Sequence, residues 1–219
     1  MKAIMISIKP KWCANIINGD KTIEVRKNKA LANAIQKLID ENGYADIYVY
    51  CSKDKPNLWL PYEYDCFELD EASKPYLSNK PILDIDTKMN GKVIFKFRCY
   101  KVEEIKVDFF ISKNGYYGTY LLSGPVLEKT SCLTHKDLKE YLRGDEKCND
   151  VQNIGYAIHI SDLEIFDRPR EICEFHTNVK KESPEELLCP ECGKPMEYYE
   201  YKYLTKAPQN FCYIEGELE

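Results

Sequence analysis

The first 26 residues place a strand, a short helix, a tight turn and a second strand in direct succession. Isoleucine recurs at every second position over Ile4–Ile8, which is typical of a strand with one buried face. Pro10 suits the first turn of a helix, and Gly19 is placed to end that helix in a left-handed conformation. The two-residue period resumes over Ile23–Val25. This stretch therefore predicts two strands that are held close together by a short connection.

Charged side chains surround the second strand. If its apolar residues face the core, Thr22, Glu24 and Arg26 share the opposite face. Lys21 lies at the turn that leads into this strand, and Lys9 lies at the end of the first one. We therefore expect these groups in one small region. The alternative is that Glu24 and Arg26 form an ion pair at the surface, which contributes at most about 1 kcal/mol.

Charge is distributed unevenly along the chain. The first thirty residues contain seven Lys and Arg against two Asp and Glu, whereas all 219 residues carry a formal net charge of -5. This local excess predicts a positive site for an anionic ligand, and the acidic total disfavours a general binder of nucleic acid backbone. No apolar run approaches the roughly 20 residues of a membrane helix, and the N-terminus lacks a cleavage-site pattern. We therefore expect a cytoplasmic protein without membrane contact.

The rest of the chain predicts a mixed α+β fold. Apolar periodicity indicates one helix and three strands, over residues 31–39, 45–51, 92–100 and 156–166. Thr134 and Asp137 open a capped helix that runs to residue 142. Because strands are many, helices are short and βαβ spacing is absent, we predict a domain around an antiparallel, barrel-like sheet.

Composition divides the chain into a core and two additions. The core covers residues 1–166, with an insertion at about 53–90 that is rich in proline and acidic residues and has no clear period. Residues 167–206 are polar, and we expect them to be irregular. Residues 207–219 contain a closing strand that returns to the core.

A known family shares these features. The run Ser7-Ile8-Lys9-Pro10, then Trp12, then Gly19-x-Lys21-x-x-Glu24-x-Arg26 resembles the ASCH domain, a relative of the PUA RNA-binding domain. Looser matches are the strand that ends at Tyr50-Cys51-Ser52, the strand from Lys92, and residues 155–162. The last of these, together with residues 207–213, resembles the larger ASCH proteins of phages and prophages. The resemblance implies a PUA-like β-barrel with short helices and a cleft for RNA or a nucleotide-like ligand.

The candidate ligand-binding residues combine cationic, acidic and aromatic side chains: Lys9, Trp12, Lys21, Glu24, Arg26, Ser52 and His159. A Lys or Arg side chain holds a phosphate or a base edge, and Arg does so with two hydrogen bonds. A carboxylate accepts from an exocyclic amine such as that of cytosine. Trp12 either packs in the core or stacks on a base, which contributes about 1–3 kcal/mol. Alternation places His159 on the cleft side of its strand, and a purely structural histidine is the alternative.

Two other functions stay open. Some ASCH members are amidohydrolases of acylated cytidine, in which the turn lysine is the base and a threonine on the next strand is the nucleophile. Lys21 matches that lysine, but Glu24 stands at the threonine position, so the covalent mechanism does not carry over. The hydrolase alternative uses Lys21 and Glu24 as an acid/base pair on a modified nucleoside or RNA, and Lys21→Ala then abolishes turnover and leaves the fold intact. The third alternative is a phage regulatory or protein-interaction module that uses residues 53–90.

The cysteines suggest one metal site. Cys189 and Cys192 stand in a Cys-Pro-Glu-Cys-Gly run that is typical of one knuckle of a zinc ribbon. Structural zinc takes four ligands, and Cys173 and His176, also two residues apart, are the best second pair. Cys212 is a possible substitute. We predict a structural zinc that stabilises a segment with little core of its own. The alternative is a metal-free turn.

Overall fold

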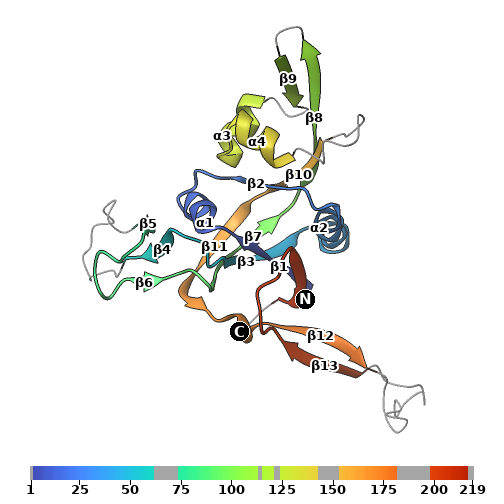
Figure 1. Ribbon diagram of the computed structural model, residues 1–219. Helices are drawn as coiled ribbons and strands as arrows, with labels where there is room; N and C mark the ends of the chain where they lie inside the picture. The colour runs from blue at the N-terminus through green and yellow to red at the C-terminus, as the bar shows by residue number, and fades with distance from the viewer. Residues whose placement is uncertain are drawn as a thin grey trace, which may run out of the picture.

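The computed structural model describes residues 2–61, 74–112, 115–120, 124–142, 153–181 and 198–216. Over these residues the chain has the predicted mixed α+β fold, with short helices around several sheets (Figure 1). The helices are α1 (Pro10–Ile17), α2 (Lys29–Asn42), α3 (Gly124–Ser131) and α4 (His135–Leu142). No helix of this described part is both long enough and apolar enough to cross a membrane.

A five-stranded sheet forms the centre of the molecule, in the order β11-β7-β3-β1-β14. Its strands are β1 (Lys2–Ile8), β3 (Ala45–Cys51), β7 (Val93–Cys99), β11 (Ser161–Arg170) and β14 (Phe211–Glu215). The pair β1 and β3 is parallel, because α1, β2 and α2 return the chain to the same end of the sheet. The other neighbours are antiparallel. The C-terminal part of the chain thereby pairs with its first strand.

A second, antiparallel sheet has the order β2-β10-β8-β9. Its strands are β2 (Ile23–Arg26), β8 (Val102–Ser112), β9 (Gly115–Tyr120) and β10 (Asn153–His159). The chain crosses directly from one sheet to the other at two corners, from β7 to β8 and from β10 to β11, and it also connects the sheets through α1 and α2 on either side of β2. Asp162 has a φ of 46° just after the second crossing. The two sheets are joined at these corners, and the described strands form no closed barrel ladder.

Two apolar clusters place the N-terminal elements. The larger one lies between the central sheet and helices α1 and α2, and includes Ile6, Ile35 and Phe95. The second joins β2 to α3 and α4 through Val25, Leu127 and Leu138. Burial of a leucine side chain contributes about 1.5–3 kcal/mol. The second cluster therefore holds α3 and α4 firmly against the strand that carries the predicted site residues.

The insertion and the segment 167–206 both contain strands. In the insertion, β4 (Asn57–Leu60), β5 (Tyr76–Ser78) and β6 (Thr87–Lys88) form a small sheet beside α1, and residues 62–73 lie outside the described residues. The prediction for 167–206 is wrong over much of its length. β11 continues to Arg170, and β12 (His176–Lys181) pairs with β13 (Tyr198–Tyr203) in a two-stranded ribbon. Tyrosines at positions 199, 201 and 203 alternate with Glu200 and Lys202, a two-residue period that is typical of a strand and that the prediction did not use.

Local signals fix the ends of α2. The side chain of Asn28 accepts a hydrogen bond from the Leu31 N–H at 3.1 Å, which caps the start of the helix. Gly43 ends it with a φ of 84°, and its N–H donates to the Ile39 carbonyl at 2.7 Å. Glycine adopts this left-handed conformation without the strain that a Cβ causes.

Gly43→Ala is expected to lower the free energy of unfolding by about 1–2 kcal/mol, the strain of an L-residue in the left-handed region. A Cβ at this position meets no atom within 4 Å, so steric contacts add nothing. Urea denaturation followed by circular dichroism measures the loss. Gly43→Asn is the control, since asparagine tolerates this conformation, and its loss should be smaller. Equal losses in the two variants would contradict the conformational explanation.

Candidate functional site

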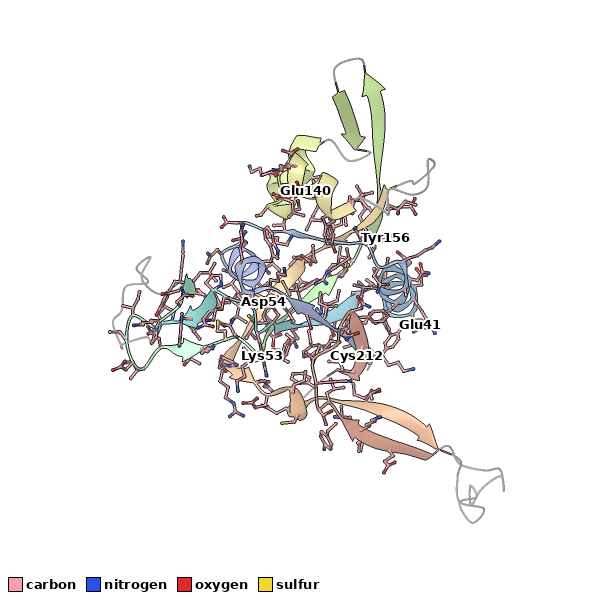
Figure 2. All side chains as sticks on the ribbon, in the orientation of Figure 1. Glu41, Lys53, Asp54, Glu140, Tyr156 and Cys212 are labelled. Carbon is pink, nitrogen blue, oxygen red and sulfur yellow. The ribbon has the colours of Figure 1, made fainter. Side chains whose placement is uncertain are left out.

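A cavity of about 630 Å³ opens between α1, β2, α4 and the ends of β1 and β3. Six of the seven predicted ligand-binding residues line it: Lys9, Trp12, Lys21, Glu24, Arg26 and Ser52. Its volume lies in the range of small-molecule sites. Figure 2 labels two further lining residues, Asp54 from the segment after β3 and Glu140 from α4. The strand–helix–turn–strand unit at the N-terminus therefore forms one wall of a cavity, and α4 contributes to another.

A chain of three ionised groups runs along β2 at this cavity. Lys21 Nζ lies 3.2 Å from Glu24 Oε2, and Arg26 Nε lies 2.8 Å from Glu24 Oε1. The second contact is an ion pair whose N–H is not aligned for a hydrogen bond. The Lys21 and Glu24 side chains are only 2% and 8% exposed. Glu24 is thus a buried carboxylate between two cations, and the alternative of an ion pair at the surface is wrong.

Lys21 is held by backbone groups as well as by this carboxylate. Its ammonium donates to the carbonyl oxygens of Ile23 and Ser131, each at 2.8 Å. With Glu24 these oxygens account for the three N–H donors of a lysine. Ser131 is the last residue of α3, so the side chain joins that helix to the turn before β2. This geometry makes Lys21 a positioning residue that fixes the Glu24 carboxylate.

Arg26 links the site to the central sheet. Its Nη2 donates to the carbonyl oxygen of Ser7 on β1 at 2.7 Å. The Arg26 side chain is 19% exposed and lines the cavity. Arginine has five donors in a planar fork, so part of the guanidinium is available to a ligand while another part holds β2 against β1.

Trp12 lies where α1 meets the cavity. The ring is half-buried, packs against the larger apolar cluster and also lines the cavity, so the two predicted roles are not exclusive. Lys11 Nζ and Lys21 Nζ lie 4.7 and 5.3 Å from its ring centroid. Cations at these distances are attracted by the ring quadrupole. The indole is therefore held in place between the core and two cations.

The charge of the lining is balanced, which corrects the prediction of a basic cleft. Lys9 and Lys11 lie at α1, whereas Asp137 and Glu140 belong to α4. Lys21 and Arg26 add two basic groups, and Glu24 and Asp54 add two acidic ones. The lining therefore has four basic and four acidic residues. The excess of basic residues among the first thirty did not indicate this balance of charge, because the acidic residues of α4 come from a distant part of the chain.

Asp137 has a second role at the start of α4. Its carboxylate accepts from the hydroxyl of Thr134 at 2.7 Å and from the Thr134 N–H at 3.0 Å, and its own N–H donates to the Thr134 hydroxyl. These hydrogen bonds, with Lys11 nearby, lower the pKa of Asp137. The predicted helix cap is confirmed, and the same residue sets the charge of one cavity wall.

His159 does not line this cavity. In the pairing of β10 with β2 it stands opposite Ile23, while Ile158 stands opposite Glu24. Directly paired residues share a face, so this register places His159 on the face away from Glu24. Its Nε2 lies 2.7 Å from Glu103 Oε2, beside a smaller hollow of about 270 Å³. Lys101 and His159 lower the pKa of the Glu103 carboxyl.

The predicted zinc ligands are only partly described. Cys189 and Cys192 lie outside the described residues. Cys173 is exposed beside β12, and the ring of His176 packs against Tyr201 and Tyr203. The described part of the chain contains no group of three metal-ligating side chains. The zinc site stays a prediction.

Several lining residues were missed from the sequence: Ser7, Lys11, Asp54, Asp137, Glu140 and Tyr141. Lys11 stands next to Trp12 within the N-terminal motif. This neighbourhood is the only sequence feature that indicates a place for Lys11 in the cavity. Asp137, Glu140 and Tyr141 share α4, whose approach to α1 depends on tertiary packing. Nothing in the spacing of the sequence indicates that approach.

Of the comparisons with known proteins, the one with solved structures finds similar proteins. No family model and no curated protein matches the sequence. Among solved structures, ASCH from Zymomonas mobilis is similar at 14% identity and a TM-score of 0.38, over 78% of this chain and 73% of that one. A mutant ZmASCH protein from the same organism is similar at 12% identity and a TM-score of 0.44, over 98% of this chain and 89% of that one. ASCH is also the family that the N-terminal motif resembles.

Lys21→Ala is expected to lower the free energy of unfolding by about 3 kcal/mol, because it leaves Glu24 and two buried carbonyls without their donor. The earlier expectation that this variant keeps the fold intact is therefore revised. Urea denaturation measures the loss. Lys11→Ala is the matched control, since this lysine also lies over Trp12 but is exposed, and its effect should stay within about 0.5 kcal/mol. If both variants were equally stable, the anchoring role of Lys21 would be refuted.

Proposed function

We propose that this chain is an ASCH domain protein that binds RNA or a nucleotide-like ligand and holds one nucleotide in the cavity along β2. The observation that carries the proposal is the Glu24 carboxylate, held between Lys21 and Arg26 at the wall of a cavity of about 630 Å³. A fixed acceptor beside a fixed donor suits a ligand that presents both kinds of group. The edges of nucleobases do so.

Glu24 and Arg26 supply the polar recognition. The carboxylate accepts from an exocyclic or ring N–H of the base, and the guanidinium donates to a carbonyl oxygen or ring nitrogen. Both side chains are held by neighbours, so little conformational freedom is lost on binding. The resemblance of the Gly19–Arg26 stretch to the ASCH motif supports the same residues.

Trp12 and the lysines at α1 supply stacking and charge. The indole lines the cavity, and a base stacked on it gains about 1–3 kcal/mol. Lys9 and Lys11 suit a phosphate at the entrance. The acidic residues on α4 disfavour a long polyanion that crosses the whole opening. One nucleotide, free or as a unit of RNA, fits this distribution better than an extended strand.

The binding test uses a panel of nucleosides, nucleoside monophosphates and short RNAs. Quenching of Trp12 fluorescence in a Trp59→Phe background reports occupancy, since Trp59 is the second tryptophan of the chain and lies outside the lining. Glu24→Gln is expected to weaken binding at least tenfold, because a hydrogen bond to a charged group contributes about 1.5–3 kcal/mol. Glu103→Gln is the control, a paired carboxylate outside the cavity, and should bind as the wild type does.

Two results would count against binding as the function. The proposal fails if no member of the panel quenches Trp12, or if Glu24→Gln binds as tightly as Glu103→Gln. Turnover of an acylated cytidine or cleavage of RNA by the wild type, lost in Glu24→Gln, would instead assign the hydrolase alternative. The same samples serve for both measurements.

We also propose a structural zinc at Cys189 and Cys192, completed by Cys173 and His176. Metal analysis of the full chain should give about one zinc per chain. Cys189→Ser combined with Cys192→Ser should remove it, because each thiolate is a direct ligand. Cys132→Ser, a change at a free cysteine beside α3, is the control and should retain the metal. A zinc-free wild type, or zinc retained by the double variant, would rule the site out.

A further inference from the structure

The β12–β13 ribbon carries exposed aromatic side chains away from the candidate cavity. The ribbon projects from the body of the molecule (Figure 1). Tyr201 and Tyr203 on β13 are 63% and 58% exposed, which is high for side chains of this size. Neither residue contributes to the cavity or to an apolar cluster of the described residues. Their exposure therefore has no explanation in the packing of the fold.

The register places both tyrosines on one face. Successive side chains of a strand alternate between faces, so Tyr201 and Tyr203 point the same way, about 7 Å apart along the strand. His176 stands opposite Tyr203, and Asn178 stands opposite Tyr201. The His176 ring packs edge-on to Tyr201 at 4.7 Å between centroids and lies 5.5 Å from the Tyr203 ring. The His176 ring thus contacts both tyrosines, which still expose more than half of their surface to solvent.

Charge favours an anionic partner. Residues 176–181 and 198–206 contain four lysines and one glutamate, Glu200, in a chain of net charge -5. By the pairing register, Glu200, Lys202 and Lys181 belong to the other face, whereas Lys180 stands in the register of the tyrosines. The two paired strands together carry three lysines and one glutamate. The connecting residues 182–197, outside the described residues, contain five glutamates and one lysine. Within the ribbon and its connection, net positive charge is therefore limited to residues 176–181 and 198–206, which suits a short stretch of an anionic partner.

We propose that the face of the ribbon formed by His176, Tyr201 and Tyr203 is a stacking platform for single-stranded nucleic acid. Each tyrosine offers its ring to one base, and the net positive charge of the two paired strands attracts the phosphates. Aromatic stacking with flanking cations is the usual means of binding single strands without reading their sequence. A protein partner is less well matched, because the described side chains of this face include no aliphatic residue. The platform is independent of the cavity and of the function proposed for it.

The test is fluorescence anisotropy of a labelled oligouridylate 12-mer with the full chain. Tyr201→Ala combined with Tyr203→Ala is expected to raise Kd at least tenfold, since each lost stack weakens binding about fivefold or more. The corresponding double Phe variant keeps both rings and should bind within twofold of the wild type. Tyr213→Ala is the matched control, because Tyr213 is 38% exposed on β14 of the central sheet, and it should also stay within twofold.

Four results would overturn the platform. They are a wild type that does not bind the 12-mer, a double Ala variant that binds it normally, a double Phe variant that loses binding, and self-association of the wild type that the double Ala variant abolishes without nucleic acid. The last would assign the face to a second copy of the chain. Quenching of Trp12 by the nucleosides and nucleoside monophosphates of the panel should be unchanged in the double Ala variant, so failure of the platform is distinguished from failure of the cavity.

Discussion

The candidate site depends on one buried carboxylate, Glu24, and on the cations on either side of it. A buried charge is costly unless other groups complete its hydrogen bonds. Here two backbone carbonyls accept from Lys21, and the carbonyl of Ser7 accepts from Nη2 of Arg26. Each cation therefore joins β2 to another element, α3 in one case and β1 in the other. The contacts of the two cations that pair with Glu24 therefore also fix the position of β2, which forms the cavity wall.

The mixed charge of the cavity reconciles an acidic protein with an anionic ligand. A net charge of -5 repels polyanions at long range, and salt screening limits that repulsion to about 10 Å. Within the cavity the lysines near α1 face the acidic residues of α4, so the local field changes sign across a short distance. Such a site selects for the arrangement of charge on a ligand rather than for its total charge. A ligand with an anionic end and a hydrogen-bonding end fits this division.

The sequence predicted those features whose cause lies within a few residues. Pro10 starts α1, Gly19 follows its end in the left-handed conformation with a φ of 80°, and Thr134 with Asp137 caps α4, because caps and turns depend on local backbone geometry. The same holds for the alternation that puts Glu24 and Arg26 on the cavity side of β2. Features set by pairing between distant strands were not predictable. His159 is the clear case. Alternation showed that it points opposite to Ile158 and Ile160, but the register of β10 against β2 decides which of these faces the cavity.

The geometry around Lys21 bears on any reaction at this site. A general base needs a lone pair that points toward a proton of the substrate. The nitrogen of Lys21 is surrounded by the oxygens of Ile23, Ser131 and Glu24, all within 3.2 Å. A neutral amine in that position has one donor too few for three oxygens, and one of them loses its hydrogen bond. The lysine therefore suits the fixing of charge better than the transfer of a proton. Chemistry in this cavity, if the protein performs any, falls to Glu24, whose carboxylate Lys21 holds in place.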